Sequence, residues 1–403
     1  MPLLPESERA VARALEAGSL FQLAKNAATA CILICDITRP VPNGLLLPAI
    51  IDTLVKAGMA PENIRVLVAT GLHRPNLDDE LRELVGNDRV LDTVRVENHY
   101  AHNDADHVDL GMTSSGTPVK LDRRFVEADL KIVTGLVEPH FMAGYSGGRK
   151  VIAPGIAHSD TITTFHHTRF MEDPLVCNCE LQRNALHKEQ LEIMGMLGPV
   201  HAVNVCLNAE RRLSSVNFGE VIVSHGEAVA FMRQFAEIPM EKRYPCVITS
   251  SAGHPLDKTY YQTIKGIVSA LGILEKGGSL LIASECSEGL GSPEFCKAQA
   301  TLVQKGIDGF LHEARGRMRA NMDEWQTVKL IEAIREHRIH LYTTGLSDQH
   351  RQLTGVTCHN DWQAAIRTVL QESSANEIAI IPEGPYVIPQ AVSAPTRDAR
   401  LRS

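Results

Sequence analysis

The sequence lacks the features of a secreted, membrane or nucleic-acid-binding protein. Its N-terminus has no basic segment followed by an apolar one, so we expect no signal peptide. Apolar runs such as residues 28–35 are too short to cross a bilayer. The 40 Lys and Arg residues are outnumbered by 48 Asp and Glu, which leaves a net charge of −8 and no basic field for nucleic acid. We therefore expect neither a membrane nor a nucleic acid among the partners.

Cysteine is present, but not in the spacing of a disulfide framework or a zinc site. The nine cysteines are an odd number, and the close pair Cys177 and Cys179 has no second pair at zinc-site spacing. Reduced thiols in a cytoplasmic enzyme are the better interpretation. The chain has 17 histidines, and several follow predicted strands, which favours acid–base or metal chemistry.

Strand and helix patterns alternate along the chain. In the first part, short apolar runs at 30–35, 64–69 and 130–134 surround a helical pattern at 45–57. Alternation of this kind predicts an α/β fold with a mainly parallel sheet. The pattern restarts near residue 240, with strands expected at 246–249, 279–283 and 339–343 and helices at 260–274, 324–337 and 362–372.

The restart indicates two α/β domains with mainly parallel sheets. We place the N-terminal domain at 1–240 and the C-terminal domain at 241–375. Residues 240–245 form the expected hinge. A tail at 376–403, with a strand at 378–381, is expected to return to the first domain.

Polar and glycine-rich loops follow three of the strands in the first domain. They are residues 36–40, 70–75 and 135–150. In open α/β sheets, ligands bind beyond the carboxyl ends of the strands. The sequence therefore predicts that these loops gather at one edge of one sheet.

The run from Gly144 to Lys150 has two interpretations. Glycines let backbone amides approach an anion, and Arg149 and Lys150 add positive charge, which is typical of phosphate binding. The run is no Walker A motif, because Val151 follows the lysine. A tight turn ahead of a helix explains the glycines equally well.

Histidines stand at several of these positions. His73 and His140 lie in two of the strand-end loops, and a pair facing one crevice could exchange protons on both faces of a substrate. His166 and His167 end a short helix that begins at Ser159 and Asp160. Imidazole binds nickel or zinc well, but a lone histidine is more often structural.

The second domain offers a carboxylate-binding pair. Gln262 and Lys265 are three residues apart and share a helix face, where an amide and an ammonium could hold a carboxylate. A solvated helix face is the simpler explanation. Trp325 is one of two tryptophans, and core packing is its default role.

Taken together, these strings resemble the nickel-dependent lactate racemase family. The resemblance runs in order from about residue 30 to the last strand. Its motifs are DITRP at 36–40, TGLHRP at 70–75, PHFMAGYSGGRK at 139–150, APG at 153–155, FHH at 165–167, YQTIK at 261–265 and EWQ at 324–326.

The resemblance implies a nickel-pincer nucleotide, which cofactor-biosynthesis enzymes must supply. It also implies an active site in the cleft between the two domains, with the cofactor site in the N-terminal domain and the C-terminal domain completing the substrate site. Lys150 matches the residue that tethers this cofactor covalently, and His166 matches the protein ligand of nickel, with His167 as the alternative. His73 and His140 match two acid–base histidines. The remaining matched residues are Asp36, Arg39, Gly147 and Gly148 near the cofactor, and Tyr261, Gln262, Lys265 and Trp325 near the substrate.

The implied reaction is inversion of C2 of a small-molecule 2-hydroxy acid, lactate or a related acid. Removal of the C2 hydrogen as hydride avoids a carbanion and passes through a 2-keto acid. One histidine would exchange the hydroxyl proton of each enantiomer. Two other functions stay open from the residues alone. One is a metal-dependent hydrolase of a phosphorylated small molecule, and the other is a non-catalytic cofactor carrier.

Overall fold

The apolar run at the start of the α/β pattern becomes the centre of a six-stranded sheet. In the computed structural model, which describes residues 1–391, β1 (Ala30–Cys35) is buried along almost its whole length. Such continuous burial is typical of parallel strands that are covered on both faces. The strand order is β10-β9-β6-β1-β2-β3, and every pairing is parallel except that of β10 with β9. The other strands are β2 (Ile64–Ala69), β3 (Arg95–Asn98), β6 (Leu130–Leu136), β9 (His201–Leu207) and β10 (Leu213–Glu220).

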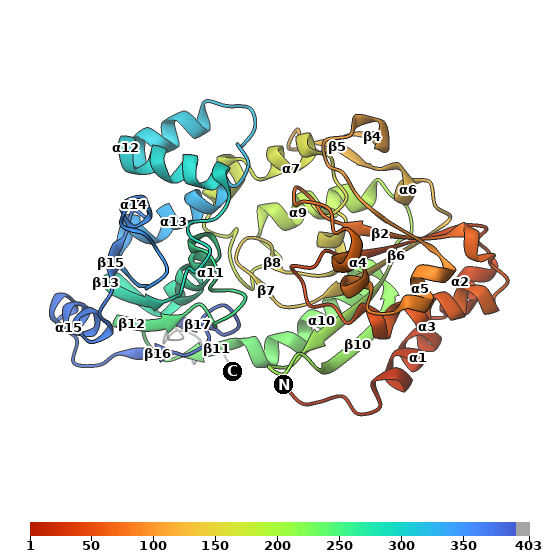
Figure 1. Ribbon diagram of the computed structural model, residues 1–403, viewed down its shortest axis with the longest axis horizontal. Coiled ribbons are helices and arrows are strands. Elements are labelled where there is room, and N and C mark those ends of the chain that lie inside the picture. The colour runs from red at the N-terminus through yellow and green to blue at the C-terminus, as the bar shows by residue number, and fades with distance from the viewer. Residues whose placement is uncertain (392–403) are drawn as a thin grey trace, which may run out of the picture. The chain divides into compact units, whose positions relative to one another are not determined.

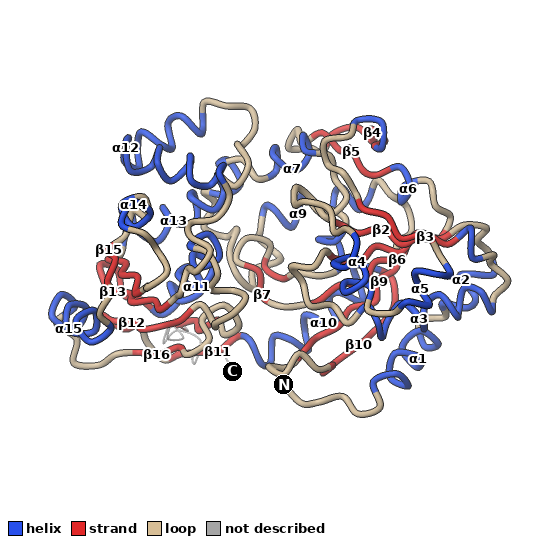
Figure 2. The backbone as a smooth tube through the Cα atoms, in the orientation of Figure 1, coloured by secondary structure: helices blue, strands red, loops and turns tan. Residues whose placement is uncertain are grey.

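Helices cover both faces of this sheet, as Figure 2 shows. On one face, apolar side chains such as Val11, Ile50 and Val90 form a continuous core with Ile32 and Val66 of the sheet. The helices of this face are α1 (Ser7–Ala17), α2 (Leu20–Lys25), α3 (Asn43–Lys56), α4 (Asp78–Val85) and α5 (Asp88–Thr93). The other face carries the 3₁₀ turn η3 (Gly148–Val151), α9 (Ala185–Gly195) and α10 (Val221–Ala236).

Smaller elements complete this first unit, which comprises Met1–Phe165 and Glu180–Gln234. Two antiparallel hairpins stand outside the main sheet. These elements are β4 (His107–Met112), β5 (Pro118–Asp122), β7 (Pro139–His140), β8 (Gly144–Tyr145), α6 (Arg123–Val126), α7 (Ser159–Phe165), η1 (Pro61–Asn63) and η2 (Asp104–Asp106).

The second unit comprises His166–Cys179 and the chain from Phe235 onward. Its main sheet has five strands, all parallel, in the order β15-β14-β13-β12-β16. Figure 1 labels β15, β13, β12 and β16 of this sheet. The five strands are β12 (Tyr244–Ser250), β13 (Leu274–Ala283), β14 (Arg338–Tyr342), β15 (Thr357–His359) and β16 (Ala379–Ile381). Its helices are α8 (Thr168–Met171), α11 (Tyr260–Ala270), η4 (Leu271–Ile273), α12 (Pro293–Arg315), α13 (Glu324–Glu336), α14 (Asp348–Gln352) and α15 (Trp362–Ser373).

The described part of the tail belongs to the second unit. β16 pairs with β12, and β17 (Ile388–Ala391) pairs with β11 (Glu237–Met240). The prediction that the tail returns to the first domain is therefore wrong for residues 379–391, because these strands satisfy their backbone hydrogen bonds within the second unit. Residues 392–403 of the predicted tail lie outside the described residues.

The boundary between the units also differs in detail from the prediction. The chain enters the second unit at Phe235, shortly before the expected hinge. The stretch His166–Cys179 was expected in the first domain but packs with α12 and α13. No helix among residues 1–391 is long and apolar enough to cross a membrane.

Candidate active site

The three polar loops of the first unit meet at one sheet edge. β6, β1 and β2 are parallel neighbours, so their carboxyl ends share that edge. Two contacts join the loops: Nδ1 of His73 lies 2.5 Å from Oδ2 of Asp36, and Arg39 forms an ion pair with Glu138. The predicted convergence of these loops is confirmed.

Asp36 is buried and held by its neighbours. Its Oδ1 accepts hydrogen bonds from the hydroxyl of Thr38 at 2.6 Å and from the Thr38 amide at 3.2 Å, while Oδ2 faces His73. Burial opposes ionisation of this carboxyl, but the hydrogen bond and charge of His73, followed by Thr38 and Arg39, lower its pKa below the ordinary value. An ionised carboxylate only accepts hydrogen bonds, so Nδ1 of His73 carries a proton. In the neutral form of the ring, the other nitrogen, Nε2, has the lone pair. The side chain of His73 is 64% exposed.

His140 is buried and has the opposite arrangement. It ends β7, and the chain turns back at once into β8. The backbone amides of Met142 and Ala143 both donate to its Nδ1, at 3.2 and 3.1 Å. Nδ1 therefore has the lone pair, and the proton of the neutral ring is on Nε2.

Lys150 lies in the turn after the glycines, close to the charged groups of the first loop. Burial, reinforced by the positive charge of Arg39, lowers its pKa from 10.5 to about 7. The thiol of Cys35 and the carboxylate of Asp36 act in the opposite direction but are weaker. The amine is thus substantially unprotonated near neutral pH, which is the form that can make a covalent bond.

Arg149, the neighbour of this lysine, holds the turn from inside. Its Nε donates to Nδ1 of His187 at 2.6 Å, and one terminal nitrogen donates to the carbonyls of Ala143 and Tyr145. The other terminal nitrogen lies 3.0 Å from Nε2 of His225. Burial lowers the pKa of Arg149 to about 9, and no carboxylate within residues 1–391 pairs with it. The turn therefore contains a buried cation that is not neutralised by an acidic side chain.

The two glycines of the turn are required by packing. Gly147 and Gly148 have φ of 78° and 48°, which side chains rarely adopt. A Cβ on Gly147 would meet Val137 at 2.7 Å, and one on Gly148 would meet His225 at 3.0 Å. The following turn, η3, has only four residues. The tight-turn interpretation explains these glycines fully, and their contact with a cofactor stays a prediction.

In the second unit, three predicted residues lie together. The ring of His166 lies 4.7 Å from that of Trp325, centroid to centroid, and the indole nitrogen of Trp325 donates to Oη of Tyr261 at 3.3 Å. Trp325 is buried, so its expected packing role is also real. Burial, and then the charge of Asp323, raise the pKa of Tyr261 well above its ordinary value, so its hydroxyl stays protonated.

The structure separates His166 from His167. Nδ1 of His167 accepts from the amide of Arg169, which makes His167 the N-cap of α8, and Nε2 lies 3.1 Å from the carbonyl of Ala314. Both ring nitrogens of His167 are thus used by the backbone. His166 is the better candidate for a metal ligand.

Gln262 and Lys265 lie on the first turns of α11, whose N-cap is Thr259. Both are half-buried. Oε1 of Gln262 is buried without a hydrogen-bond partner, and a buried acceptor of this kind is costly unless a ligand satisfies it. That this pair binds a carboxylate stays a prediction.

Two family models match the chain. The Lactate racemase N-terminal domain matches residues 2–176, and the Lactate racemase C-terminal domain matches residues 240–389. The chain belongs to the lactate racemase family. It is therefore an isomerase of the racemase type. Its α/β fold with mainly parallel sheets agrees with the prediction.

Curated members of the lactate racemase family cover nearly the whole chain. The lactate racemase of Thermoanaerobacterium thermosaccharolyticum is 29% identical over 386 residues, covering 94% of this chain and 89% of the relative. The lactate racemase of Lactiplantibacillus plantarum is 28% identical over 392 residues, with the same coverage.

Solved structures have the same fold as this chain. The lactate racemase apoprotein of Thermoanaerobacterium thermosaccharolyticum superposes with a TM-score of 0.90 at 28% identity, covering 96% of this chain and 94% of that one. A Thermotoga maritima protein has a TM-score of 0.73 at 17% identity, covering 96% and 98%, and shares the fold.

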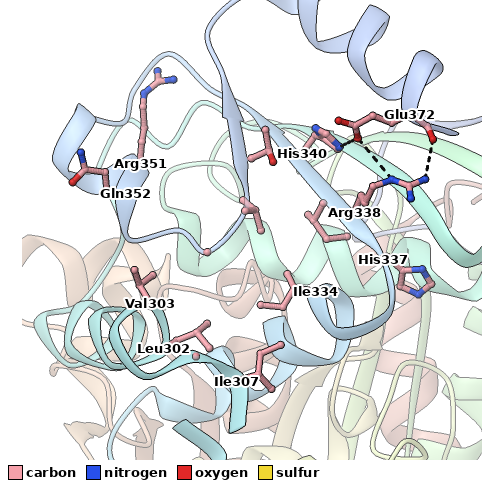
Figure 3. A pocket seen from close by; sticks show the side chains of 15 residues that line it. Leu302, Val303, Ile307, Ile334, His337, Arg338, His340, Arg351, Gln352 and Glu372 are labelled. Atoms are coloured by element: carbon pink, nitrogen blue, oxygen red, sulfur yellow. Dashed lines mark hydrogen bonds and ion pairs between the residues drawn. The ribbon is translucent and has the colours of Figure 1, made fainter. Parts of the chain in front are cut away.

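The second unit of this family member also has a pocket of about 620 Å³ away from the predicted residues. Arg338 and His340 at the start of β14 line it, together with Ile307 and Glu372, and Figure 3 shows the ion pairs of Glu372 with Arg338 and His340. None of the predicted site residues lines it. It lies at the amino-terminal edge of the sheet, whereas α11 follows the carboxyl end of β12. This pocket is therefore separate from the family motifs.

Sequence reasoning missed several partners of the family motifs. Glu138, which pairs with Arg39, lies in the strand-end loop 135–150 and could have been found as a complementary charge. His187 and His225 lie 38 and 76 residues beyond Arg149, and no local signal connects them. Asp36 was assigned to the cofactor's surroundings, but the structure pairs it with His73.

Proposed function

We propose that the chain racemises a 2-hydroxy acid, lactate or a close relative, with a nickel-pincer nucleotide bound. The observation that carries the proposal is the lysine of lowered pKa, Lys150, at the same sheet edge as the Asp36–His73 pair. Membership of the lactate racemase family supports lactate as the first substrate to test.

The chain's own residues fit such a cofactor. An amine with a pKa of about 7 suits covalent attachment, and the buried charge of Arg149 suits a phosphate. Within residues 1–391, no group of three or more His, Cys, Asp or Glu side chains could hold a metal ion. A single imidazole such as His166 would need an organic group to supply the remaining ligands, as a pincer does.

Each predicted residue then has a role. Lys150 would tether the cofactor, His166 would ligate nickel, and Asp36 and Arg39 would support the first loop. When bound, the cofactor would supply a hydride acceptor, so that C2 becomes planar as a 2-keto acid before it regains hydrogen on either face. His73 and His140 would serve the C2 oxygen as it loses and regains its proton.

The second unit would provide the substrate contacts. Lys265 would bind the carboxylate by charge, and Gln262 would use its unsatisfied Oε1 to accept a hydrogen bond from the substrate hydroxyl. The hydroxyl of Tyr261 stays protonated and accepts a hydrogen bond from the indole nitrogen of Trp325, and it would donate a hydrogen bond to the substrate. A closed site would keep the keto acid from escaping.

A metal-dependent hydrolase finds less support. Catalytic zinc sites use three protein ligands, and no such group occurs among residues 1–391. We also propose a cytoplasmic location, since none of the nine cysteines forms a disulfide.

The test combines mass and optical purity. The protein is co-expressed with the cofactor-biosynthesis enzymes, its intact mass and nickel content are measured, and a panel of single-enantiomer 2-hydroxy acids is followed by chiral chromatography. We expect a covalent adduct on Lys150 and loss of optical purity, without exchange of C2 deuterium into solvent. Full activity at unmodified mass without nickel would refute the proposal.

A further inference from the structure

The pocket at the amino-terminal edge of the second unit's sheet has an aliphatic wall and a polar wall. Figure 3 shows side chains of α12 on the opposite side of the pocket from Arg338, His340 and Glu372. Its volume of about 620 Å³ lies in the range of small-molecule sites, which are mostly apolar with a few polar groups that orient the ligand. The aliphatic side chains that line it are Leu302, Val303, Ile307, Ile334, Ile339 and Val356.

We propose that this pocket binds a monocarboxylate with an aliphatic tail. The carboxylate would lie between Arg338 and His340, and the tail would lie against the aliphatic wall. This site stands independently of the proposed function, because none of the predicted site residues lines the pocket.

The polar wall is already arranged around a carboxylate, that of Glu372. Nε of Arg338 lies 3.7 Å from Oε2 of Glu372, and Nε2 of His340 lies 2.9 Å from the same oxygen. A guanidinium and an imidazole thus converge on one carboxylate, which is a common way for proteins to bind this group. Glu372 therefore stands where the carboxylate of a ligand would bind.

Glu372 is held weakly enough to be replaced. Its side chain is 40% exposed, and ion pairs of exposed groups contribute little to stability. It also lies in the last turn of α15, where the helix dipole disfavours a negative charge. Movement of Glu372 into solvent would therefore cost little and would leave Arg338 and His340 as donors for the ligand.

His340 has a buried nitrogen that its neighbours within residues 1–391 do not satisfy. The side chain is 2% exposed, and Nε2 lies near Glu372 but makes no aligned hydrogen bond. Because Nε2 faces a carboxylate, it carries the proton of the ring, and Nδ1 accepts from Nε2 of His359 at 3.0 Å. Burial lowers the pKa of His340, so near pH 7 the ring is a neutral N–H donor. A buried donor without an acceptor is costly, and the carboxylate of a ligand would provide one.

The charge of the pocket selects an anion. Among the described residues that line it, Arg338 and Arg351 are the strong bases and Glu372 is the only acid. The guanidinium of Arg351 donates to the carbonyls of Thr343 and Leu346, so it contributes charge rather than a contact. Once Glu372 is displaced, the lining favours an anion over an amine or an alcohol.

The first test is calorimetric titration of cofactor-free, full-length protein at neutral pH with acetate, butyrate, hexanoate and octanoate. Hexylammonium and hexanol are the controls for charge. We expect the affinity to rise along the series by up to about fourfold per methylene, and hexanoate to bind more tightly than either control. Tighter binding of hexylammonium, or no saturable binding of any carboxylate, would overturn the proposal.

Four variants locate the binding site. Arg338→Gln should weaken hexanoate binding at least about tenfold, as expected for a lost hydrogen bond to a charged group. Glu372→Gln removes the competing carboxylate and should tighten binding by up to about fivefold, a gain that misfolding cannot produce. Val303→Glu adds a negative charge to the aliphatic wall and should abolish binding, whereas Val223→Glu, at an exposed valine of α10, is the matched control and should retain it.

Lys265→Ala separates this pocket from the proposed substrate site, since both would take a carboxylate. Hexanoate affinity should be unchanged in Lys265→Ala. Loss of hexanoate binding in Lys265→Ala with unchanged binding in Arg338→Gln would assign the ligand to the substrate site and overturn the proposal. None of these measurements uses racemase activity, so a failure of the proposed function would be seen separately.

Discussion

The two groups of predicted site residues are built from different chemistry. In the first unit, charged side chains from three strand-end loops are bonded to one another: Asp36 to His73, and Arg39 to Glu138. In the second unit, the aromatic side chains of Tyr261 and Trp325 lie at the starts of two helices. The comparison indicates that the first group is organised by electrostatics and protonation, and the second by packing and hydrogen bonding.

The largest loss of activity should come from replacing Lys150, the proposed attachment point of the cofactor. Lys150→Ala removes the amine, so we expect no covalent adduct and activity below detection, because the cofactor carries the hard step. Intact mass and chiral chromatography measure both. Lys56→Ala, at an exposed position of α3, is the control and should keep adduct and activity. An active Lys150→Ala enzyme would remove the basis for calling this group the cofactor site.

Asp36→Asn tests whether protonation organises the charged group. Thr38 donates twice to Oδ1, so the new amide must present its NH₂ to His73 and move the proton of that ring to Nε2. We expect kcat to fall by about 10²- to 10⁴-fold with both enantiomers of the substrate. A ¹⁵N-histidine NMR spectrum should show the changed tautomer in a folded protein. A changed spectrum with unchanged kcat would contradict the role of His73.

A neighbouring pair of histidines offers the next contrast. His166→Ala should lose nickel while keeping the Lys150 adduct. Its nickel affinity should fall by more than the roughly 10- to 100-fold expected when a residue that only supports a metal ligand is removed. His167→Ala removes the N-cap of α8 and should cost about 0.5–2 kcal/mol of stability, with nickel retained. Metal analysis and thermal unfolding compare the two variants. Nickel loss only in His167→Ala would reverse the assignment.

Trp325→Phe addresses the aromatic group. It keeps a ring beside His166 but removes the indole N–H that donates to Tyr261 at 3.3 Å. Loss of one such hydrogen bond is worth about 1 kcal/mol, so we expect a roughly fivefold fall in kcat/KM. Steady-state kinetics with circular dichroism as a folding control provide the measurement. A loss of several hundred-fold would mean that the indole does more than position its neighbours.

The smallest effect is a shift in a pH midpoint. Since the pKa of Lys150 is lowered, its amine is protonated below about pH 7 and becomes reactive as the pH rises through that value. Arg39→Gln removes a positive charge that contributes to the lowering, so the midpoint should move upward. Competitive labelling with acetic anhydride on cofactor-free protein, with peptide mass spectrometry, measures it. A downward shift would contradict this electrostatic explanation.

Much of the first group could be predicted because its motifs follow strands. Apolar runs indicate the strands, and parallel neighbours bring their carboxyl ends together, so Asp36 and His73 were expected at one edge. The hydrogen bond between them was not expected, because the 37-residue separation along the chain does not indicate the direction of either side chain. The placement of His166–Cys179 in the second unit was also missed, because the helix before it reads as a continuation of the first.

The sequence alone determined the fold class, the family and the residues worth testing, because periodicity and motif order are local properties that survive without coordinates. Tertiary structure decided which nitrogen of each histidine holds a proton, which of two adjacent histidines is committed to the backbone, and how far burial lowers the pKa of Lys150. These properties depend on what lies opposite a group in space, and residues distant along the chain supply it.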